Sequence, residues 1–258
     1  MRKERAGVVF QEQIADHIYS LSLKAGFAKE VKPGQFVLLY SSDRSRLLPR
    51  PISICQVSRE TGTIRLVYRI AGEGTREFSG LRPGDGIDIL GPVGNGFPIA
   101  DFKDKKVLLV GGGIGIPPLL GAAYELEHPV FAAGYRSETY LLDDLSARGR
   151  VLVATEDGSL GVRGNVLDAI RQEYQKPSEL PDAFFACGPL PMLRALAEFA
   201  GEQGLPCYVS LEERMACGIG ACLGCITKTA GVDGHSKVHN ARICTDGPVF
   251  RAEEVDWS

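Results

Sequence analysis

The stretch KVLLVGGGIGIPPLLGAAYELE, residues 106–127, decides the fold of the middle of this chain. Residues 106–110 form a short apolar run, which predicts a buried strand. The run leads directly into a turn with four glycines, and the residues after the turn have a helical composition. Pro117 and Pro118 stand in the first turn of that helix, where proline is tolerated. We therefore expect a strand, a tight turn and a helix in direct succession.

The alternation of strand and helix continues on the C-terminal side of this unit. Short apolar strands are predicted at 129–136, 150–158 and 182–189, and helices at 164–175 and 190–204. Alternation of this kind predicts a parallel sheet built from βαβ units. We expect residues 101–206 to form this α/β domain, with a linker over residues 97–105 leading into it.

The first hundred residues favour β-structure instead. Short strands are predicted at 35–40 and 84–91, and residues 63–70 alternate with a period of two, with Ile64, Leu66 and Tyr68 on one face. Turn signals such as KPGQ and RPGD separate these strands, and no long helical pattern competes with them. The region 1–100 is therefore predicted to be a small antiparallel β-barrel domain.

Composition narrows the class of protein. The chain has 258 residues, 44% of them hydrophobic, and a formal net charge of -3, which does not suggest a broad nucleic-acid or membrane surface. The basic start lacks the apolar run of a signal peptide, and no segment approaches the ~18 apolar residues of a membrane span. Seven cysteines without a secretory signal make a disulfide framework improbable. We expect a cytoplasmic protein.

The glycine turn at 111–115 is a candidate nucleotide site. Glycines between a strand and a helix allow the backbone to approach a pyrophosphate at the helix N-terminus. The spacing differs from G-x-G-x-x-G, because the sixth position from Gly111 is Ile116, and a tight turn without a ligand is the alternative. The loops at 155–165 and 187–192 also follow strands, and a small buried residue is the alternative reading of Cys187.

The predicted barrel carries residues suited to phosphate. Arg50 stands between two prolines in LPRPISIC, followed by Ser53, and GEGT at 72–75 ends in Thr75. An arginine fork, glycine N–H groups and a hydroxyl can together cradle an anion. Taken singly these residues are weak signals, since most surface arginines are simply solvated.

The loop MACGIGACLGC, residues 215–225, carries the spacing C-x4-C-x2-C, and a fourth cysteine follows after 18 residues. This is the spacing of a plant-type [2Fe–2S] cluster, and Gly218, Gly220 and Gly224 would let backbone amides point at the sulfurs. A four-cysteine zinc site or a C-x-x-C redox pair are alternatives. The predicted ligands, in a small C-terminal domain at 207–258, are Cys217, Cys222, Cys225 and Cys244.

The histidines give no catalytic constellation. His17, His128, His235 and His239 are scattered along the chain, so a surface or structural role is expected for each. His239 lies close enough to Cys244 in sequence to replace it as a ligand, which is a minor alternative. No catalytic side chain is predicted, since a flavin can exchange a hydride with a nicotinamide and single electrons with an iron–sulfur centre.

The motifs RPIS, GEGT, GPVGNGF, GGGIGIPPL and CGP occur in this order, and residues 5–205 resemble the ferredoxin-reductase flavoproteins. The resemblance implies an FAD-binding barrel followed by a nicotinamide-nucleotide domain. It implies that FAD is contacted by Arg50, Pro51, Ile52, Ser53, Val67, Tyr68, Arg69, Gly74 and Thr75. It implies that NAD(P) is contacted by Gly111, Gly112, Gly113, Ile114, Gly115, Asp157, Gly158, Cys187, Gly188 and Pro189.

Over its whole length, including SLEERMACGIGACLGC and CTDGPVF, the chain resembles the electron-transfer subunits of type B dihydroorotate dehydrogenases. This resemblance implies FAD, a [2Fe–2S] cluster and NAD as cofactors, and a role in pyrimidine (UMP) biosynthesis. It implies a partner, the FMN-containing catalytic subunit that oxidises dihydroorotate, in a heterotetramer with two copies of each chain.

Other assignments stay open on sequence grounds. The alternatives are an NAD(P)H-dependent ferredoxin or sulfide oxidoreductase subunit, and a non-catalytic protein that senses redox state or binds a partner. The choice between NAD and NADP is also open. Arg136 and Ser137 could hold a 2′-phosphate, whereas Glu138 would hydrogen-bond a 2′-hydroxyl.

Overall fold

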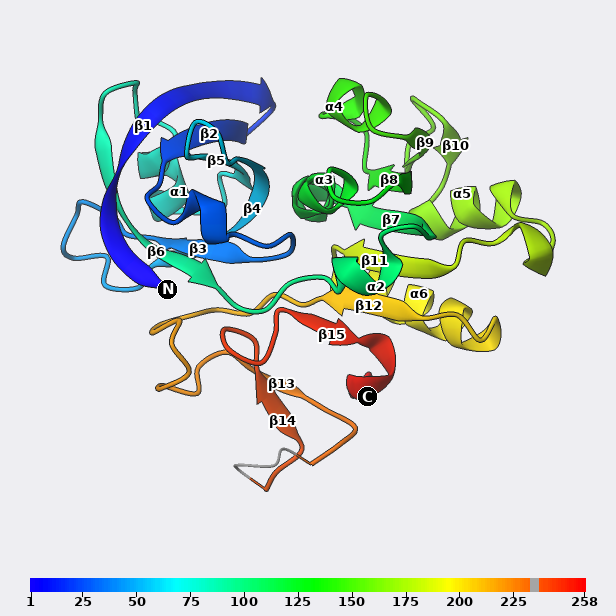
Figure 1. Ribbon diagram of the computed structural model, residues 1–258. Coiled ribbons are helices and arrows are strands. Elements are labelled where there is room, and N and C mark those ends of the chain that lie inside the picture. The colour runs from blue at the N-terminus through cyan, green and yellow to red at the C-terminus, as the bar shows by residue number, and fades with distance from the viewer. Residues whose placement is uncertain (233–236) are drawn as a thin grey trace.

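The computed structural model describes residues 1–232 and 237–258; His235 lies outside these ranges. A closed barrel and a seven-stranded sheet stand side by side, and the C-terminal segment lies beneath both (Figure 1). The strands are β1 Arg2–Ala15, β2 Ile18–Lys24, β3 Phe36–Leu39, β4 Arg50–Ser58, β5 Thr63–Arg69, β6 Gly86–Val93, β7 Lys106–Gly112, β8 His128–Tyr135, β9 Arg150–Thr155, β10 Val162–Arg163, β11 Ala183–Cys187, β12 Cys207–Ser210, β13 Ile226–Lys228, β14 Asn240–Arg242 and β15 Val249–Arg251. The helices are α1 Glu73–Phe78, α2 Ile99–Phe102, α3 Pro117–Ala123, α4 Leu142–Ser146, α5 Val166–Glu173 and α6 Leu190–Glu202.

The antiparallel barrel has the strand order β1-β2-β5-β4-β3-β6. The period of two in β5 is confirmed, because Ile64, Leu66 and Tyr68 are all buried in the barrel core. Val67, on the opposite face, is buried as well, since it packs into the core of the neighbouring sheet region. The prediction missed β1, β2 and β4. Half of the residues of β1 are charged or polar, and most of its length is exposed.

Two short helices depart from the sequence expectation. The GEGT segment forms the start of α1, a six-residue helix in a region where the sequence shows no long helical pattern. The presumed linker at 97–105 contains α2, a single turn. Helices this short bury too few residues to leave a periodic pattern in the sequence.

The parallel sheet has the order β10-β9-β8-β7-β11-β12-β15 and confirms the α/β prediction. Its strands pair in parallel except β15, which pairs antiparallel with β12. Pro117 and Pro118 open α3 as expected. The edge strand β15 comes from the C-terminal segment, and its three residues are too few to be predicted from periodicity.

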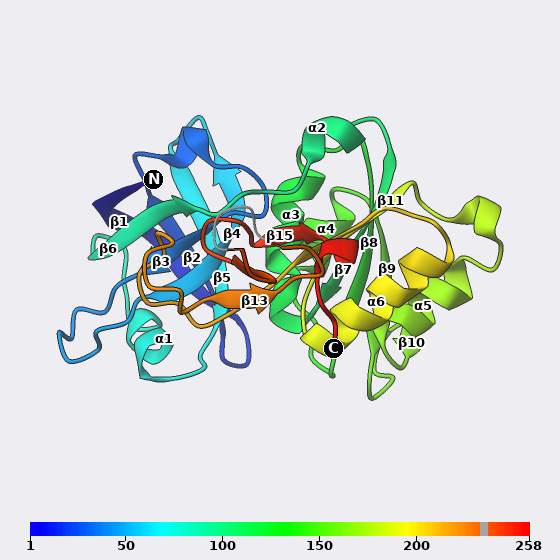
Figure 2. The same ribbon diagram turned by 90° about the horizontal axis from the view of Figure 1, so that it is seen from below.

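The three regions share their cores. Helix α3 lies between the barrel and the sheet in both ribbon views (Figures 1 and 2), and Cys55 and Val67 of the barrel pack in one cluster with Leu119 and Leu120 of α3. Figure 2 shows the C-terminal segment crossing both regions. A second cluster accordingly joins Leu38 of the barrel to buried residues of the C-terminal segment, among them Cys244.

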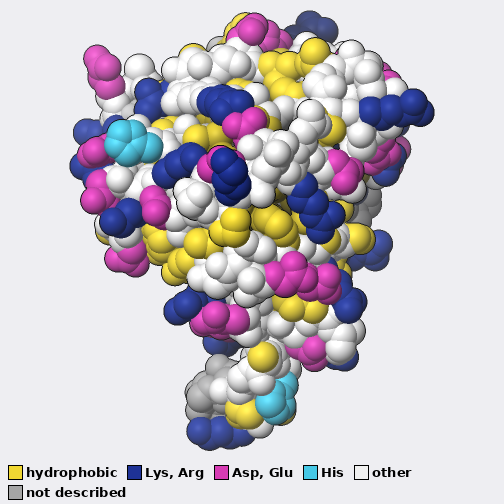
Figure 3. Space-filling view, turned by 90° about the vertical axis from the view of Figure 1, so that its right-hand side faces the viewer, with side chains coloured by type: hydrophobic (Ala, Val, Ile, Leu, Met, Phe, Trp, Pro, Cys, Tyr) yellow, Lys and Arg dark blue, Asp and Glu magenta, His cyan; other side chains and the backbone are white. Residues whose placement is uncertain are grey.

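The distribution of surface charge and the character of the helices agree with the composition of the chain. On the side of the molecule shown in Figure 3, Lys and Arg side chains are interspersed with Asp and Glu. Within residues 1–232 and 237–258, no helix has the length and apolar character needed to cross a membrane.

Candidate cofactor sites at the junction of the three regions

The glycine turn follows strand β7 and lies beside the loop that follows the neighbouring strand β11. Strands β7 and β11 pair in parallel, with Gly111 opposite Cys187, so their loops emerge together at one edge of the sheet. The chain at Gly115 lies against the Cys187 carbonyl so closely that a Cβ would collide with it. Only glycine fits this approach. The structure therefore brings the predicted NAD residues at 111–115 and 187–189 into one place.

The other two predicted NAD residues lie farther along the same edge. Asp157 and Gly158 follow β9, which is separated from β7 by β8. The Asp157 carboxylate accepts hydrogen bonds from the Ser159 amide at 3.0 Å and the Ser159 hydroxyl at 2.7 Å, which lower its pKa. Asp157 thus orders its own loop.

Ser137 and Glu138, which bear on the choice between NADP and NAD, also lie at this edge of the sheet. The Glu138 carboxylate accepts a hydrogen bond from the Asp16 amide of the barrel at 2.9 Å. Glu138 therefore links the sheet region to the barrel. The neighbouring Ser137 carbonyl accepts the Ser159 hydroxyl at 3.3 Å, which ties the loops after β8 and β9 together.

Arg50 and Gly74, two of the residues predicted to cradle phosphate, lie together in the barrel. The Arg50 guanidinium lies against the backbone of Gly74, and a Cβ at Gly74 would occupy its place. Thr75, predicted as an anion contact, also has a local structural task. Its hydroxyl accepts the Ala71 amide at 2.8 Å and donates to the Gly72 carbonyl at 3.0 Å, so it closes the turn before α1.

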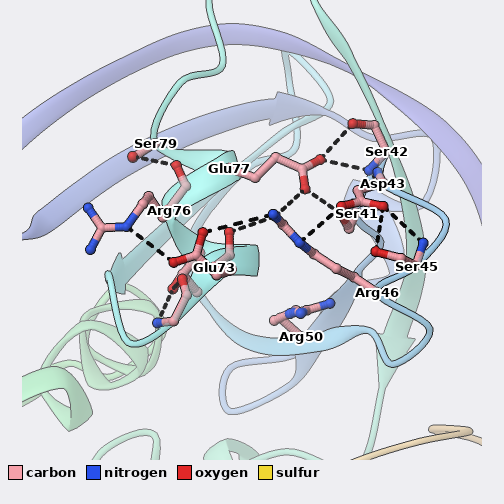
Figure 4. A network of polar contacts seen from close by, with 12 residues as sticks. Ser41, Ser42, Asp43, Ser45, Arg46, Arg50, Glu73, Arg76, Glu77 and Ser79 are labelled. Atoms are coloured by element: carbon pink, nitrogen blue, oxygen red, sulfur yellow. Dashed lines mark hydrogen bonds and ion pairs between the residues drawn. The ribbon is translucent and has the colours of Figure 1, made fainter.

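A polar network fixes the loop that precedes Arg50. Glu77 of α1 accepts hydrogen bonds from the Ser42 amide and hydroxyl, each at 2.7 Å, and from the Ser41 hydroxyl. Arg46 donates to Glu77 at 3.0 Å and to the Glu73 carbonyl at 2.9 Å. Figure 4 shows this network beside the Arg50 side chain. Partial burial raises the pKa of Glu77, but the serine bonds and Arg46 outweigh it and hold that pKa below its ordinary value.

The segment Val67–Arg69 has its side chains in three environments. Val67 packs toward the sheet region, and Tyr68 is buried in the barrel with its hydroxyl donating to Gln11 at 3.1 Å. Burial raises the pKa of Tyr68. Arg69 instead extends out of the barrel, and its Nη2 is 3.8 Å from the position that a Cβ of Gly113 would take. The barrel and the nucleotide turn therefore meet at Arg69.

The cysteine loop gathers all four predicted ligands. The cysteines lie in two pairs: the Cys217 Sγ accepts the Cys222 amide at 3.4 Å, and the residue before Cys244, Ile243, donates its amide to the Cys225 carbonyl at 2.9 Å. In the part of the chain that the structure describes, no three histidine, cysteine or carboxylate side chains form a group around one metal position. The two pairs of thiols match a two-iron cluster in which each iron takes two thiolates. His239 is directed elsewhere, with Nδ1 3.2 Å from the Ala230 carbonyl.

Backbone amides surround the sulfurs. The Sγ of Cys217 accepts N–H groups from Ile219 and Cys222 at 3.4 Å, and the Sγ of Cys222 accepts that of Gly224 at 3.4 Å. The Gly220 amide donates to the Cys244 Sγ at 3.2 Å. Of the three glycines expected to direct amides at sulfur, Gly220 and Gly224 do so. Such N–H groups stabilise thiolates and tune a cluster held by them.

The half-buried Cys217 and the buried Cys244 differ in acidity. Burial raises the pKa of Cys217, but the amides of Ile219 and Cys222 outweigh this and bring it to about 6. Burial and the neighbouring Cys225 thiol raise the pKa of Cys244 to about 12. Cys217 is therefore already suited to bind metal as a thiolate, whereas Cys244 would lose its proton on binding.

The cysteine loop lies directly on the barrel. The backbone at Gly218 is so close to the Leu38 side chain that no Cβ would fit between them. Leu38 of β3 pairs with Pro51 of β4, so the loop is one strand away from the predicted FAD residues 50–53. Burial, together with the Cys217 thiolate, raises the pKa of Tyr40 at the end of β3.

Sequence reasoning missed Asn95, which fastens the C-terminal segment in place. Its side-chain amide donates to the Val249 carbonyl at 2.7 Å and to the Asp246 carbonyl at 3.1 Å, and it accepts the Val249 amide at 3.0 Å. Its backbone amide donates to the Gly247 carbonyl at 2.6 Å. The GPVGNGF motif contained the residue, but nothing local to that motif indicates a partner some 150 residues away.

Comparison with known proteins agrees with this arrangement. Residues 212–256 match the iron–sulfur cluster binding domain of dihydroorotate dehydrogenase B. The chain is 39% identical to the "dihydroorotate dehydrogenase B (NAD(+)), electron transfer subunit" of Fusobacterium nucleatum, covering 99% of both chains. It is 42% identical to the protein of the same name from Geobacillus kaustophilus, covering 98% of both. Among solved structures, an NADH-dependent reduced ferredoxin–NADP oxidoreductase superimposes with a TM-score of 0.84 at 31% identity, covering 98% of this chain and 90% of the other.

Proposed function

Because this chain belongs to the family of dihydroorotate dehydrogenase B electron-transfer subunits, we propose that it carries electrons between an FMN-containing dihydroorotate dehydrogenase subunit and NAD+. The product of the partner reaction, orotate, would then enter pyrimidine biosynthesis. The cofactors of the chain are FAD, a [2Fe–2S] cluster and NAD.

One observation supports this route above the others: the candidate sites follow one another across neighbouring strands. The cysteine loop lies on Leu38 of β3, and Leu38 pairs with Pro51 of β4, which is part of the FAD segment. Strand β5 is next in the barrel, and Arg69 at its end reaches the glycine turn at Gly113. FAD bound along β4 and β5 would therefore lie between NAD and the cluster.

The residues proposed to hold FAD and NAD are among those predicted from the sequence, and each has its own role. Arg50 and the backbone of Gly74 would bind the FAD diphosphate, and Thr75 keeps the turn before α1 in shape. Gly111–Gly115 and the loop from Cys187 to Pro189 would receive NAD. When bound, FAD exchanges a hydride with nicotinamide and single electrons with an iron–sulfur cluster, so no side chain of this protein has to transfer a proton.

Each of the three regions carries one of these proposed sites. We propose residues 1–100 as the FAD domain, 101–206 as the NAD domain and 207–258 as the cluster domain. The strand β15, which belongs to the last of these in sequence, completes the edge of the NAD domain's sheet. We also propose a cytoplasmic location, in keeping with seven cysteines that are all free of disulfides.

Co-expression with a dihydroorotate dehydrogenase catalytic subunit tests this function. We expect the two chains to co-purify as a heterotetramer that reduces NAD+ when dihydroorotate is added, with flavin and cluster absorption that NADH bleaches. The same chain expressed alone is the control, and it should be bleached by NADH without oxidising dihydroorotate. A colourless protein that contains zinc would contradict the proposal.

A ferredoxin-linked reductase is the second candidate, and the superposition with an NADH-dependent reduced ferredoxin–NADP oxidoreductase favours it. That assignment predicts NADPH- or NADH-driven reduction of added ferredoxin by the isolated chain. Ferredoxin reduction at a rate well above that of dihydroorotate-linked turnover would select it over the first candidate.

A further inference from the structure

A cavity of about 250 Å³ lies between the barrel and the end of helix α3, apart from the candidate cofactor sites. The FAD segment 50–53 begins strand β4, whereas residues 54–57 farther along that strand line the cavity. Helix α3 likewise begins beside the glycine turn, whereas Tyr124 and Glu125, just beyond its last residue, line the cavity. Strand β4 and helix α3 lie side by side (Figure 1), so each has cofactor residues at one end and this cavity at the other.

Contacts between the barrel and α3 hold the walls of the cavity at a fixed separation. The pairing of β4 with β5 is shifted at Cys55, which packs in one core cluster with residues of α3. A Cβ on Gly121 of α3 would stand only 3.1 Å from the Cys55 carbonyl oxygen, so strand and helix backbones are in close contact. Arg59, after β4, pairs with Glu125 and also donates to the Val31 carbonyl at 3.3 Å. The cavity is therefore a built feature of this junction.

One wall of the cavity is aromatic. Tyr124 is 46% exposed, so its ring is available to a ligand. The Arg148 guanidinium lies 4.7 Å from the centre of this ring and donates to the Ala123 carbonyl at 3.2 Å, which holds the ring in place. Pro33 and Val57 add apolar surface to the lining. A flat, apolar ligand is the kind that such walls favour.

The polar groups of the lining are suited to an anion. Among the described residues, the Lys32 ammonium and the Gln56 side-chain amide have no hydrogen-bond partner, although both residues line the cavity. Lys32 and Arg59 bring two positive charges against the single carboxylate of Glu125. The Gln56 amide offers one donor and one acceptor group side by side, which match the N–H and C=O of a cyclic imide.

We propose that this cavity binds a small planar heterocyclic carboxylate, with its ring against Tyr124, its carboxylate on Lys32 and its imide edge on Gln56. The volume suits a single substituted ring, since pockets for drug-sized ligands start at roughly 300 Å³. Orotate has this chemistry, and dihydroorotate has the same groups on a ring that is not flat. Orotate as the natural occupant rests on the proposed function, whereas the class of ligand rests on the lining residues. The product of the partner subunit would then bind at the junction of the FAD and NAD regions.

Calorimetric titration of the purified chain, with FAD and cluster bound, tests the site without redox turnover. We expect orotate to bind at one site, and dihydroorotate to bind about 5-fold more weakly or less tightly still, because its puckered ring stacks poorly on Tyr124. Benzoate, which lacks the imide, and uracil, which lacks the carboxylate, should each bind more weakly than orotate. Saturating NAD+ should leave the orotate affinity unchanged, because the cavity is apart from the glycine turn.

Two variants separate the contacts. Lys32→Gln should weaken orotate and benzoate alike, by about 10-fold, and leave uracil unchanged. Gln56→Leu should weaken orotate and uracil by about 3- to 10-fold and leave benzoate unchanged. Lys29→Gln and Gln172→Leu alter exposed residues outside the cavity and are the matched controls, so both should bind all four compounds as the unaltered protein does.

Other outcomes would overturn the proposal. Absence of orotate binding by a chain with full FAD and iron content would show that the cavity is not a site for this class of ligand. Displacement of orotate by NAD+ would place orotate at the cofactor edge instead. Unchanged orotate binding in both variants would remove Lys32 and Gln56 from the site. These titrations need no partner subunit, so failure of the dihydroorotate-linked assay would leave a measured site standing and remove only orotate as its natural occupant. Normal turnover without orotate binding would remove the site and leave the proposed function.

Discussion

At the scale of single residues, cysteine has two different roles in this chain. Cys55, Cys187 and Cys207 are buried among apolar neighbours, and burial raises the pKa of each thiol. The cysteines of the loop instead meet backbone N–H groups, and in Cys217 these lower the pKa to about 6 against the effect of burial. Local backbone geometry, more than residue type, therefore separates packing cysteines from candidate ligands.

Replacement of Cys222 tests the ligand assignment. Cys222→Ser removes the thiol that pairs with Cys217, so we expect loss of the cluster absorption and of iron, and loss of electron transfer to the partner. Reduction of FAD by NADH should partly survive, because the FAD and NAD residues lie in the other two regions. Cys207→Ala, a buried cysteine outside the loop, is the control and should keep its iron. Full transfer to the partner in Cys222→Ser would show that Cys222 is not a ligand.

At the scale of elements, short irregular segments position the sites. Glu77 and Arg46 of the polar network hold the loop before β4. This loop leads into Arg50, so the network helps to place the Arg50 side chain beside Gly74. The segment after β6 holds the C-terminal region through Asn95. Neither segment has a regular hydrogen-bond ladder, so side-chain hydrogen bonds replace it.

Asn95→Ala should loosen the C-terminal segment while leaving the barrel folded. The substitution removes three side-chain hydrogen bonds to that segment, and we expect a loss of stability of about 1–2 kcal/mol. Hydrogen exchange at the Val249 amide should accelerate, and the cluster should be lost faster on dilution. Asn165→Ala, which uncaps α5 instead, should destabilise the protein without changing exchange at Val249. Equal exchange at Val249 in Asn95→Ala and the unaltered protein would disprove this role.

At the scale of the whole molecule, function depends on how the barrel and the sheet region are held together. Arg65 of β5 bonds Asp144 of α4 at 3.0 Å and 3.4 Å, and also donates to the Ser20 hydroxyl at 2.9 Å. Glu138 reaches the Asp16 amide on the same side of the junction. These contacts join β5 to the region that carries the glycine turn, so they fix how the barrel sits against the sheet region.

Asp144→Ala should slow the reduction of FAD by NADH several-fold, with unchanged FAD and iron content. The ion pair is partly exposed, with 20% and 33% of the two side chains accessible, so its loss should cost only about 1 kcal/mol of stability. Stopped-flow bleaching of the flavin measures the rate. Arg150→Ala breaks a similar ion pair with Glu173 inside the sheet region and should leave the rate unchanged. An unaltered rate in Asp144→Ala would show that this contact does not set the cofactor geometry.

The amino-acid sequence by itself determined the barrel, the parallel sheet, the glycine turn and the cysteine spacing. Each of these leaves a short-range trace, because the periodicity of burial, glycine at a close approach and ligand spacing are all properties of consecutive residues. Only the tertiary structure decided that Thr75 closes a turn, that Glu138 bonds the barrel, that Asn95 fastens a distant segment and that Arg69 faces Gly113. All but the first of these are contacts between residues far apart in the chain, and strand order and packing fix such contacts after the local elements have formed.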